Sequence, residues 1–411
     1  MPSSEIAVFE QECSAFLQDN ARPVAQRSAQ WGVGDDALSS YAAIEPEADR
    51  VRVRDAKRWK ALEFDAGFGW LSGPMSAGGG GLTPEHERLY LSMRSEYDVP
   101  ALGVFVISLG MVASTFLAFG SPEVQALVPQ LHRGDLIGCQ LFSEPGAGSD
   151  LAGLTTRAER DGDQWVITGQ KVWTSVAHHS DWGLLLARSE STSSKHDGLT
   201  AFALDMRTPG VEVRPLEMMT RGREFNEVFF DGVRISDTRR LGEAGKGWRT
   251  AIATLMNERA LGAAGNDLFG VERTLERLRL TLQQPGMGAD NPVVRQAFAR
   301  AYSMAQTIRY QAMAADARRE AGLPPGPAES VFKLANTETL RRIVDLAGAI
   351  WGPRAIADTG EWGAYSWADM ILTMPGMRIA GGTDEVMRNI LGERVLGLPK
   401  DPPPPSTGAG A

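Results

Sequence analysis

A glycine-rich segment flanked by hydroxyl groups is the first feature of this sequence that could carry chemistry. It lies within 140–156, QLFSEPGAGSDLAGLTT, where Gly146 and Gly148 stand between Ser143 and Ser149. Glycines let the backbone approach a ligand closely and turn its N–H groups toward an oxyanion, and the serine hydroxyls add donors. No Gly-Lys-Ser/Thr follows and no Rossmann helix opens here, so the segment is neither of those phosphate loops. It is either a ligand-binding loop or a polar loop that enters a β region.

An aromatic ring and hydroxyl groups come together further along, in 168–175, TGQKVWTS. Trp173 and Ser175 are residue types that can flank a planar ring. The alternative is a tryptophan that only packs at a strand end, which is the usual role of a single tryptophan. His178 and His179 follow. Adjacent side chains on a strand point to opposite faces and chelate one ion poorly, so we interpret both histidines as rim residues and expect no metal site.

A charged pair lies on a predicted helix with one apolar face, 248–260, WRTAIATLMNERA. At helical spacing, one face of this helix carries Trp248, Ile252, Leu255, Met256 and Ala263. Arg259 falls near the centre of that apolar stripe and Glu258 at its edge. Buried charges are costly unless they are paired or used. Glu258 is therefore either a catalytic carboxylate or half of a simple surface ion pair with its neighbour.

Three regions with different sequence patterns position these residues. The order of helical, β and helical patterns predicts an α+β protein. An N-terminal α-helical domain covers 1–135, a central antiparallel β-domain 136–243, and a C-terminal four-helix-bundle-like domain 244–399; the Pro-rich tail 400–411 reads as disordered. Helices are predicted over 5–20, 48–66, 84–96, 101–119, 246–264, 268–284, 291–321, 329–350 and 383–396. Strands are predicted in a hairpin that turns at 161–163 and over 183–188, 199–206, 211–216 and 227–235.

Composition excludes several classes of protein. The 411 residues are 43% hydrophobic and 23% charged, which is typical of a globular protein. A net charge of -9 argues against nucleic-acid binding, which needs clustered Lys and Arg. Cys13 and Cys139 form no metal spacing and no disulfide framework, and no basic and apolar leader opens the chain, so a cytoplasmic setting fits. The uncharged segment 101–119 is long enough to span a bilayer, but we interpret it as a buried helix and expect no stable membrane insertion.

Four segments, taken in order, resemble the acyl-CoA dehydrogenase family. They are EPGAGSD at 144–150, TGQKVWTS at 168–175, FDGVRI at 230–235 and LGEAGKG at 241–247. The resemblance extends over nearly the whole chain, including the α–β–α order and a Gly-Gly-Thr that opens a C-terminal helix. It implies bound FAD, removal of two hydrogens from the carbons next to an acyl-CoA thioester, and transfer of the electrons to an electron-transfer flavoprotein.

The resemblance also assigns roles to individual residues. The implied FAD contacts in the first half of the site are Phe142, Ser143, Gly148, Trp173 and Ser175. Phe142 and Ser143 would meet the pyrimidine edge of the flavin, Trp173 would lie against the isoalloxazine, and Ser175 would hydrogen-bond near N5. Ser149 matches a position that touches the pantetheine of CoA. Donors at these edges stabilise negative charge on a reduced flavin, so the implied roles agree with the residue types.

The base is where this sequence departs from many relatives. They carry a glutamate in a Tyr-Glu-Gly-Thr sequence, but Gly381 occupies that position here and cannot accept a proton. Isovaleryl-CoA and long-chain dehydrogenases carry the base on an earlier helix, and there this chain has Glu258, with Arg259 beside it as a further substrate-site residue. Glu385 is the nearest rival, but the resemblance assigns the Thr383–Glu385 turn to FAD.

A second departure leaves three functions open. Many relatives have an Arg-x-x-Phe-Gly sequence that reaches the FAD pyrophosphate across a dimer interface, and 277–291, RLRLTLQQPGMGADN, lacks it. Phosphate contacts would then come from Arg279 or from a partner chain. The chain is either an active dehydrogenase that forms trans-2-enoyl-CoA as a homodimer or homotetramer, a non-catalytic or half-site subunit of a mixed assembly, or a flavin oxidase or monooxygenase of the same fold.

Overall fold

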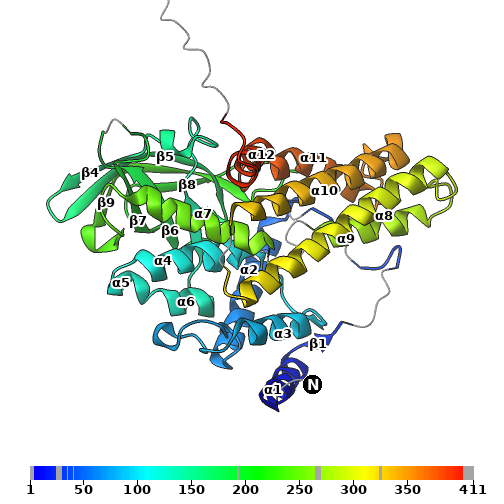
Figure 1. The fold of residues 1–411 in the computed structure, drawn as a ribbon, viewed down its shortest axis with the longest axis horizontal. Coiled ribbons are helices and arrows are strands. Elements are labelled where there is room, and N and C mark those ends of the chain that lie inside the picture. Colours follow the sequence, from blue (N-terminus) through cyan, green and yellow to red (C-terminus); the bar gives the residue numbers. More distant parts are fainter. Residues whose placement is uncertain are drawn as a thin grey trace, which may run out of the picture. The chain divides into compact units, whose positions relative to one another are not determined.

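The computed structural model describes residues 4–24, 30–34, 36–39, 41–191, 194–263, 270–323 and 326–400, without the side chains of 258–263 and 319–320. The chain divides into two compact units (Figure 1). The first comprises Met1–Val33 and Ser40–Glu258, and the second comprises Gly34–Ser39 and Arg259–Ala411. The first unit therefore contains both the N-terminal helices and the β region, and the division into three domains stays a prediction. The predicted disordered tail lies outside the described residues beyond Lys400.

The helices of the first unit confirm most of the predicted N-terminal elements. These are α1 (Ser4–Asn20), α2 (Pro46–Asp65), α3 (Pro84–Arg94), α4 (Ser114–Phe119), α5 (Pro122–Gln125) and α6 (Val128–Arg133). A short two-stranded sheet, β1 (Arg22–Pro23) with β2 (Tyr97–Asp98), ties the connections together. The aromatic rings of Phe16, Phe68 and Tyr90 pack against one another between these helices. Amphipathic helices are stabilised chiefly by such burial of one face.

The predicted helix over 101–119 is interrupted. It consists of a 3-10 turn at Gly103–Phe105, a π-helical segment at Ser108–Ala113, and then α4. Met111 and Phe116 are fully buried, which confirms the interpretation of this segment as part of the interior. Among the described residues, no helix combines the length and apolar character needed to cross a bilayer.

The β region forms one sheet whose strands lie close to the predicted ones. They are β3 (Gly138–Leu141), β4 (Arg157–Asp161), β5 (Gln164–Ser175), β6 (Trp182–Arg188), β7 (Leu199–Asp205), β8 (Val211–Pro215), β9 (Phe225–Ser236) and β10 (Arg240–Leu241). Their order is β10-β7-β6-β4-β5-β9-β8, and β3 pairs with β6. The predicted hairpin pairs Asp161 with Gln164 across a turn in which Gly162 has φ +64°. Pairing is antiparallel except that β6 runs parallel to β3 and β4, which the sequence did not indicate.

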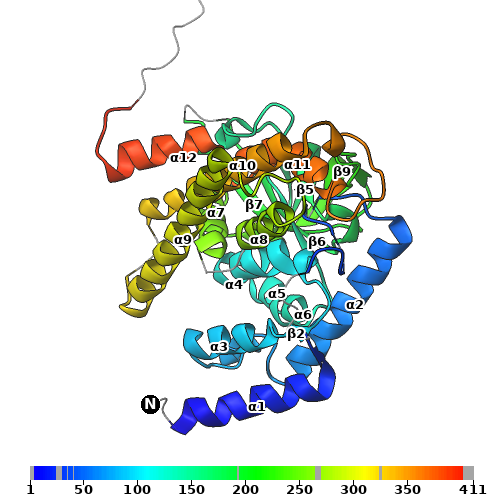
Figure 2. The same cartoon turned by 90° about the vertical axis from the view of Figure 1, so that its right-hand side faces the viewer.

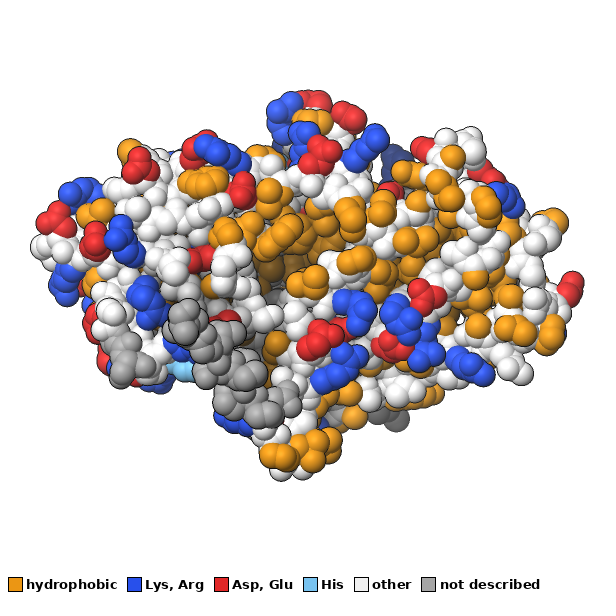
Figure 3. Space-filling model, turned by 90° about the horizontal axis from the view of Figure 1, so that it is seen from above, with side chains coloured by type: hydrophobic (Ala, Val, Ile, Leu, Met, Phe, Trp, Pro, Cys, Tyr) orange, Lys and Arg blue, Asp and Glu red, His pale blue; other side chains and the backbone are white. Residues whose placement is uncertain are grey.

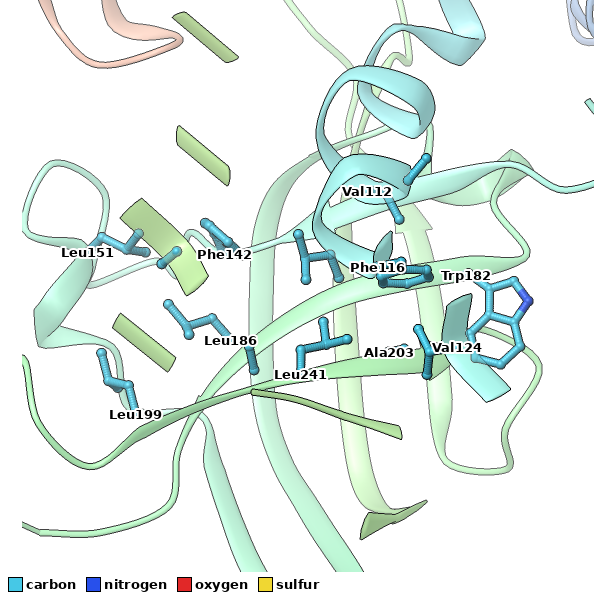
Figure 4. Packing of buried hydrophobic residues seen from close by; sticks show 14 of the residues in the cluster. Val112, Phe116, Val124, Phe142, Leu151, Trp182, Leu186, Leu199, Ala203 and Leu241 are labelled. Carbon is cyan, nitrogen blue, oxygen red and sulfur yellow. The ribbon is translucent and has the colours of Figure 1, made fainter. Parts of the chain in front are cut away.

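Both faces of β6 and β7 are buried, which explains their continuous apolar sequences. On one face, Leu184 and Leu186 pack against Phe116 of α4 and against Phe142, in the cluster that Figure 4 shows. On the other face, residues such as Leu185 join a core shared with β5 and β9. The chain leaving β3 toward the glycine-rich segment is therefore anchored by Phe142 in the main core of the first unit.

The second unit is built around one central helix. Its elements are α8 (Val271–Leu282), α9 (Pro292–Glu320), α10 (Ser330–Trp351), α11 (Tyr365–Ile379) and α12 (Asp384–Ile390). Helix α10 packs against α8, α9, α11 and α12 (Figures 1 and 2). The sequence did not predict α11, because Pro375 and Gly376 lie in its last turns and such residues usually end helices. The predicted helix over 383–396 is α12 followed by a π-helical turn at Leu391–Val395.

Candidate functional site

The glycine-rich segment forms a tight turn held by its own backbone. Glu144 and Ala147 exchange both backbone hydrogen bonds, each 3.0 Å long, around Pro145 and Gly146. Phe142 is buried before the turn, and the N–H of Val172 donates to the carbonyl of Ser143 at 2.9 Å. The structure therefore brings the 142–148 segment and the end of β5 side by side, as the predicted flavin contacts Phe142, Ser143 and those on β5 require.

A buried ion pair fixes that arrangement. Lys171 is fully buried, and its Nζ donates to Glu144 Oε1 and to the carbonyl of Phe142, both at 2.8 Å. Glu144 also accepts from the backbone N–H groups of Thr155 and Thr156 at 2.7 and 2.9 Å. Burial raises the pKa of Glu144, but Lys171 and these donors outweigh it and lower the pKa to about 2. Lys171 and Glu144 lie in the two motifs, but residue type and spacing do not predict that they pair.

The glycines of the segment face open space. A Cβ built at Gly146 or Gly148 would meet nothing within 4 Å among the described residues, so packing inside the chain does not require glycine at either position. By contrast, a Cβ at Gly169 would lie 2.6 Å from the hydroxyl oxygen of Thr156, so this glycine permits the close approach of β5 to the preceding segment. Gly146 and Gly148 thus leave room for a group from outside the chain. Ser149 is exposed next to this space.

Trp173 does not simply pack at a strand end. Its backbone has φ +59°, a left-handed conformation that is rare for a bulky residue, at an irregularity in the β5–β9 pairing. Its ring is 61% exposed and meets Phe225 edge-on at 6.0 Å between ring centroids. Ser175 is half-buried, and its hydroxyl has no hydrogen-bond partner within the described part of the chain. A strained backbone that presents an exposed aromatic ring is typical of a functional site.

Helix α7 (Gly247–Ala263) carries the predicted base, but the side chains of Glu258 and Arg259 lie outside the described residues. The preceding turns of the helix confirm the prediction in part, because Trp248 and Leu255 are partly buried against the main core. Ile252 and Met256, expected on a buried apolar stripe, are 37% and 41% exposed. The buried face instead carries Thr250, Ala251 and Thr254.

Hydrogen bonding explains why small polar residues form the buried face of α7. The hydroxyls of Thr254 and Thr115 are 2.9 Å apart, so two threonines satisfy each other where the helix meets the interior. Position 258 follows Ala251 by two helical turns. Position 258 therefore belongs to the same stripe of α7 as the buried Ala251.

The predicted FAD turn in the second unit begins α12. Thr383 is the N-cap residue, and its hydroxyl accepts from the N–H of Val386 at 3.1 Å, as expected from its position before the helix. Glu385 is exposed in the first turn, 3.5 Å from Arg388. Gly381, where many relatives have a glutamate, has φ +67°. The local backbone is thus one that favours glycine at this position.

A second buried lysine stabilises the turn before α12 by hydrogen bonds. Lys333 Nζ donates to Asp384 Oδ1 and to the carbonyl of Arg378, both at 2.7 Å. Asp384 also accepts from the guanidinium of Arg378 at 2.9 Å and from the hydroxyl of Thr337 at 3.0 Å. Burial raises the pKa of Asp384, but these partners outweigh it and hold that pKa below its usual range. This network was not predicted, because nothing in the sequence marks Lys333 as buried.

The two adjacent histidines do not point to opposite faces of a strand, contrary to the prediction from the sequence. His178 and His179 lie on a 3-10 turn, Ala177–His179, and not on a strand. Their Nε2 atoms are 3.8 and 2.6 Å from the same carboxylate oxygen of Asp49, so they converge instead of pointing apart. Burial and the neighbouring His179 lower the pKa of His178.

Comparisons with known proteins show which family the chain resembles. Residues 139–233 match the family model of the middle domain of acyl-CoA dehydrogenases, and residues 245–396 match that of their C-terminal domain. Acyl-CoA dehydrogenase IpdE1 of Mycobacterium tuberculosis is 36% identical over 375 residues, which cover 90% of this chain and 96% of that protein.

Solved structures show the same fold. The ChsE4-ChsE5 complex from Mycobacterium tuberculosis matches with a TM-score of 0.74 and 24% identity, covering 98% of this chain and 99% of that one. The glutaryl-coenzyme A dehydrogenase complex with glutaryl-CoA matches with a TM-score of 0.70 and 22% identity, covering 97% of each chain.

Proposed function

Since this chain belongs to the acyl-CoA dehydrogenase family, we propose that it converts an acyl-CoA thioester to the trans-2-enoyl-CoA with Glu258 as the base. Members of this family are FAD-dependent oxidoreductases that act on CH–CH bonds, and this chain is an acyl-CoA dehydrogenase. The observation that carries the proposal is the exposed ring of Trp173 on a left-handed backbone, beside a turn braced by the buried Lys171–Glu144 pair.

The residues of the first unit fit a planar cofactor. Trp173 offers an exposed aromatic face, and Gly148 leaves open space in front of the backbone. Ser143 and Ser175 have hydroxyls that no group in the described part of the chain uses. We infer that these residues, with the backbone at Phe142, hold the flavin of FAD through stacking and hydrogen bonds. FAD, when bound, supplies the acceptor for the hydrogen that leaves the β-carbon as hydride.

The proton requires a base from the chain itself. A thioester carbonyl can take up negative charge, so a positioned carboxylate can remove the α-proton. Gly381 has no side chain to do so, which leaves Glu258 as the candidate from the family's two positions. Position 258 follows Ala251 and Thr254, both buried, at helical spacing on α7. Arg259 would help to organise the base and the substrate.

Three further contacts complete the proposed site. Ser149 lies exposed next to Gly148, where it can meet the pantetheine of CoA. Thr383 uses its oxygen to cap α12 and still has a hydroxyl proton to donate, and Glu385, beside Arg388, keeps a carboxylate oxygen that can accept from a cofactor hydroxyl. We propose that both residues contact FAD.

Replacement of Glu258 by Gln tests the base directly. The Glu258→Gln protein should retain its flavin, while anaerobic bleaching of the flavin by an acyl-CoA slows by about 10²–10⁴-fold. Glu272→Gln, an exposed position on α8, is the matched control and should bleach at the wild-type rate. Unchanged bleaching in Glu258→Gln would show that another group takes the proton. Rapid peroxide release in air would instead indicate an oxidase or monooxygenase.

A mixed assembly is the second candidate, and the arginines of α8 favour it. The segment 277–291 lacks Arg-x-x-Phe-Gly. Arg279 is paired with Glu276 at 2.6 Å, and the Arg277 guanidinium donates to the carbonyl of Asp36 at 2.9 Å and lies 4.0 Å from the ring of Trp362. Neither arginine is therefore readily available for a pyrophosphate. Colourless protein that acquires flavin only with a second chain would favour this candidate over the first.

We propose that the chain assembles as a homodimer or homotetramer and passes its electrons to an electron-transfer flavoprotein. Large hydrophobic side chains are exposed on the helices of the second unit, among them Val293, Tyr310 and Ile379 at 74%, 66% and 64%. Figure 3 shows hydrophobic side chains gathered over this part of the molecule. Exposed apolar surface of this kind indicates a protein interface. Light scattering on the purified chain measures the assembly, and a monomer would contradict it.

A further inference from the structure

A cluster of one carboxylate and two imidazoles lies in the first unit, apart from the residues assigned to FAD. Asp49 comes from α2, and His178 and His179 from the 3-10 turn after β5. Each of the three offers one ligand atom, and these atoms all lie within 4.8 Å of one another. His179 Nε2 is 2.6 Å and His178 Nε2 is 3.8 Å from Asp49 Oδ2. The two ring nitrogens therefore converge on one carboxylate oxygen.

The other carboxylate oxygen is already occupied. Arg52 donates from both Nε and Nη2 to Asp49 Oδ1, at 3.0 and 2.7 Å. This bond orients the carboxylate so that Oδ2 is turned toward the histidines. The arginine offsets the charge of Asp49, and the half-buried Glu224, which interacts electrostatically with both residues, adds negative charge nearby. Glu224 therefore offsets the positive charge that Arg52 places beside the three ligand atoms.

A buried asparagine fixes the tautomer of His178. The side chain of Asn226 is fully buried, and its Nδ2 donates to the carbonyls of Thr174 and Glu224 at 2.9 and 3.3 Å. Its Oδ1 is therefore an acceptor, and it faces His178 Nδ1 at 3.0 Å. The proton of the neutral ring must then be on Nδ1, so Nε2 presents a lone pair toward Asp49. A histidine held by one nitrogen with the other nitrogen bare is the arrangement that proteins use for metal ligands.

We propose that Asp49, His178 and His179 bind one divalent transition-metal ion such as Zn²⁺. Two imidazoles and a carboxylate are a ligand set that Zn²⁺ accepts, with water in the fourth position. All three side chains are partly exposed, so an ion and its water can enter. Metal–ligand bonds of about 2.0–2.2 Å need the short Asp49–His179 contact to open slightly, and the neutral ring of His179 must carry its one proton on Nδ1 so that Nε2 can bind the metal.

The site would join α2 to the turn that follows the proposed flavin contact Ser175. A bound ion that favours the folded arrangement stabilises it by mass action. The metal is therefore structural in this proposal, and it takes no part in the dehydrogenation. The proposed metal site does not depend on Glu258 being the base.

The experiment titrates the full-length, flavin-loaded protein with Zn²⁺ after treatment with EDTA and removal of the chelator. Isothermal titration calorimetry should give one equivalent bound, and Co²⁺ should give the intense visible bands of a four-coordinate site. The near-isosteric Asp49→Asn, together with His178→Gln and His179→Gln, should each weaken binding at least about tenfold. His196→Gln removes an exposed histidine elsewhere in the same unit and should bind like wild type.

Unfolding temperatures separate loss of the site from loss of the fold. Without metal, Asp49→Asn should still unfold cooperatively, and Zn²⁺ should raise the unfolding temperature of wild type and His196→Gln but not that of Asp49→Asn. Absence of saturable binding would overturn the proposal. Equal binding in wild type and in both His178→Gln and His179→Gln would also overturn it, because the ions would then sit elsewhere.

Discussion

The two turns proposed to contact FAD, one in each unit, are braced in the same way. In the first unit, Lys171 donates to Glu144 and to the backbone carbonyl of Phe142, both at 2.8 Å. In the second, Lys333 donates to Asp384 and to the backbone carbonyl of Arg378, both at 2.7 Å. Each lysine is buried and ties a carboxylate in the turn to a neighbouring strand or helix. A buried charge can hold a loop rigidly because it has few alternative partners.

The two turns differ in the number of cationic side chains that contact the carboxylate of each turn. The other donors to Glu144 are the backbone and hydroxyl groups of Thr155 and Thr156, so Lys171 is its sole cation within the described residues. Asp384 has Arg378 as a second cation, and the arginine side chain is 43% exposed. The first turn therefore depends on a single ion pair. In the second turn, the charge of Asp384 is compensated by a buried lysine and by a partly exposed arginine. Removal of the lysine should have a larger effect in the first unit.

Replacement of Lys171 by Met is the strongest test of this difference. The methionine fills the space of the lysine but leaves Glu144 buried without a cation, which should cost about 3–5 kcal/mol. Urea unfolding followed by tryptophan fluorescence measures the loss, and flavin content should fall with it. Lys195→Met, which removes an exposed partner of Asp150, is the control and should cost about 1 kcal/mol or less. A loss in Lys171→Met no larger than in the control would contradict the single-pair interpretation.

Protonation of Glu144 at low pH should break the same Lys171–Glu144 ion pair. Burial raises the pKa of Glu144, but Lys171 and the threonine donors outweigh it, so the folded pKa is about 2 against an ordinary value of 4.5. A carboxylate with a lowered folded pKa stabilises the protein above its unfolded pKa, and this stabilisation is lost as the pH falls through the folded pKa. The window is therefore about pH 4.5 down to about pH 2, and the contribution is on the order of 3 kcal/mol.

Glu144→Gln isolates that contribution. The variant should be less stable than wild type near neutral pH, and the difference in unfolding free energy should shrink as the pH falls through the window. Unfolding curves at a series of pH values measure the difference. If the gap between the two proteins stayed constant below about pH 4, Glu144 would not titrate with a lowered pKa.

Replacement of Lys333 by Met should have a smaller effect than Lys171→Met. Asp384 would lose one charged hydrogen bond, worth about 1.5–3 kcal/mol, but would keep Arg378 and Thr337. Hydrogen exchange of the amides at the start of α12, such as Val386, measures the loss locally, so unfolding of the first unit does not obscure it. A loss as large as that of Lys171→Met would mean that Arg378 does not compensate.

The sequence predicted elements well where one kind of pattern dominated. The hairpin turn at Gly162 and the strands after it were predicted close to their observed bounds, because turn residues separate short β-prone runs there. Helix α11 was missed because Pro375 and Gly376 lie inside it, where packing against α10 outweighs their local preference. The buried face of α7 was predicted on Ile252 and Met256, because hydrophobicity alone cannot reveal that Thr254 is satisfied by Thr115.

The proposed site was predictable only in part. Motifs located the segment around Ser143 and the ring of Trp173, and the Gly-Gly-Thr sequence placed Thr383 at the opening of a C-terminal helix. Lysine is usually exposed, so no rule based on residue type could have identified Lys171 or Lys333 as buried braces. Such braces depend on partners far away in the sequence, and only the fold brings them together.

The smallest effect is expected for Arg378→Gln, and it sharpens the comparison most. The arginine is partly exposed and Asp384 keeps Lys333, so the change alone should cost about 0.5 kcal/mol or less. In the Lys333→Met background the same change removes the last cation from a buried carboxylate, so its cost should rise by at least about 1 kcal/mol. Hydrogen exchange at the start of α12 in the four proteins of this double-mutant cycle measures the coupling. Additive effects would mean that the two cations act independently, and the contrast with the single pair of the first unit would then need another cause.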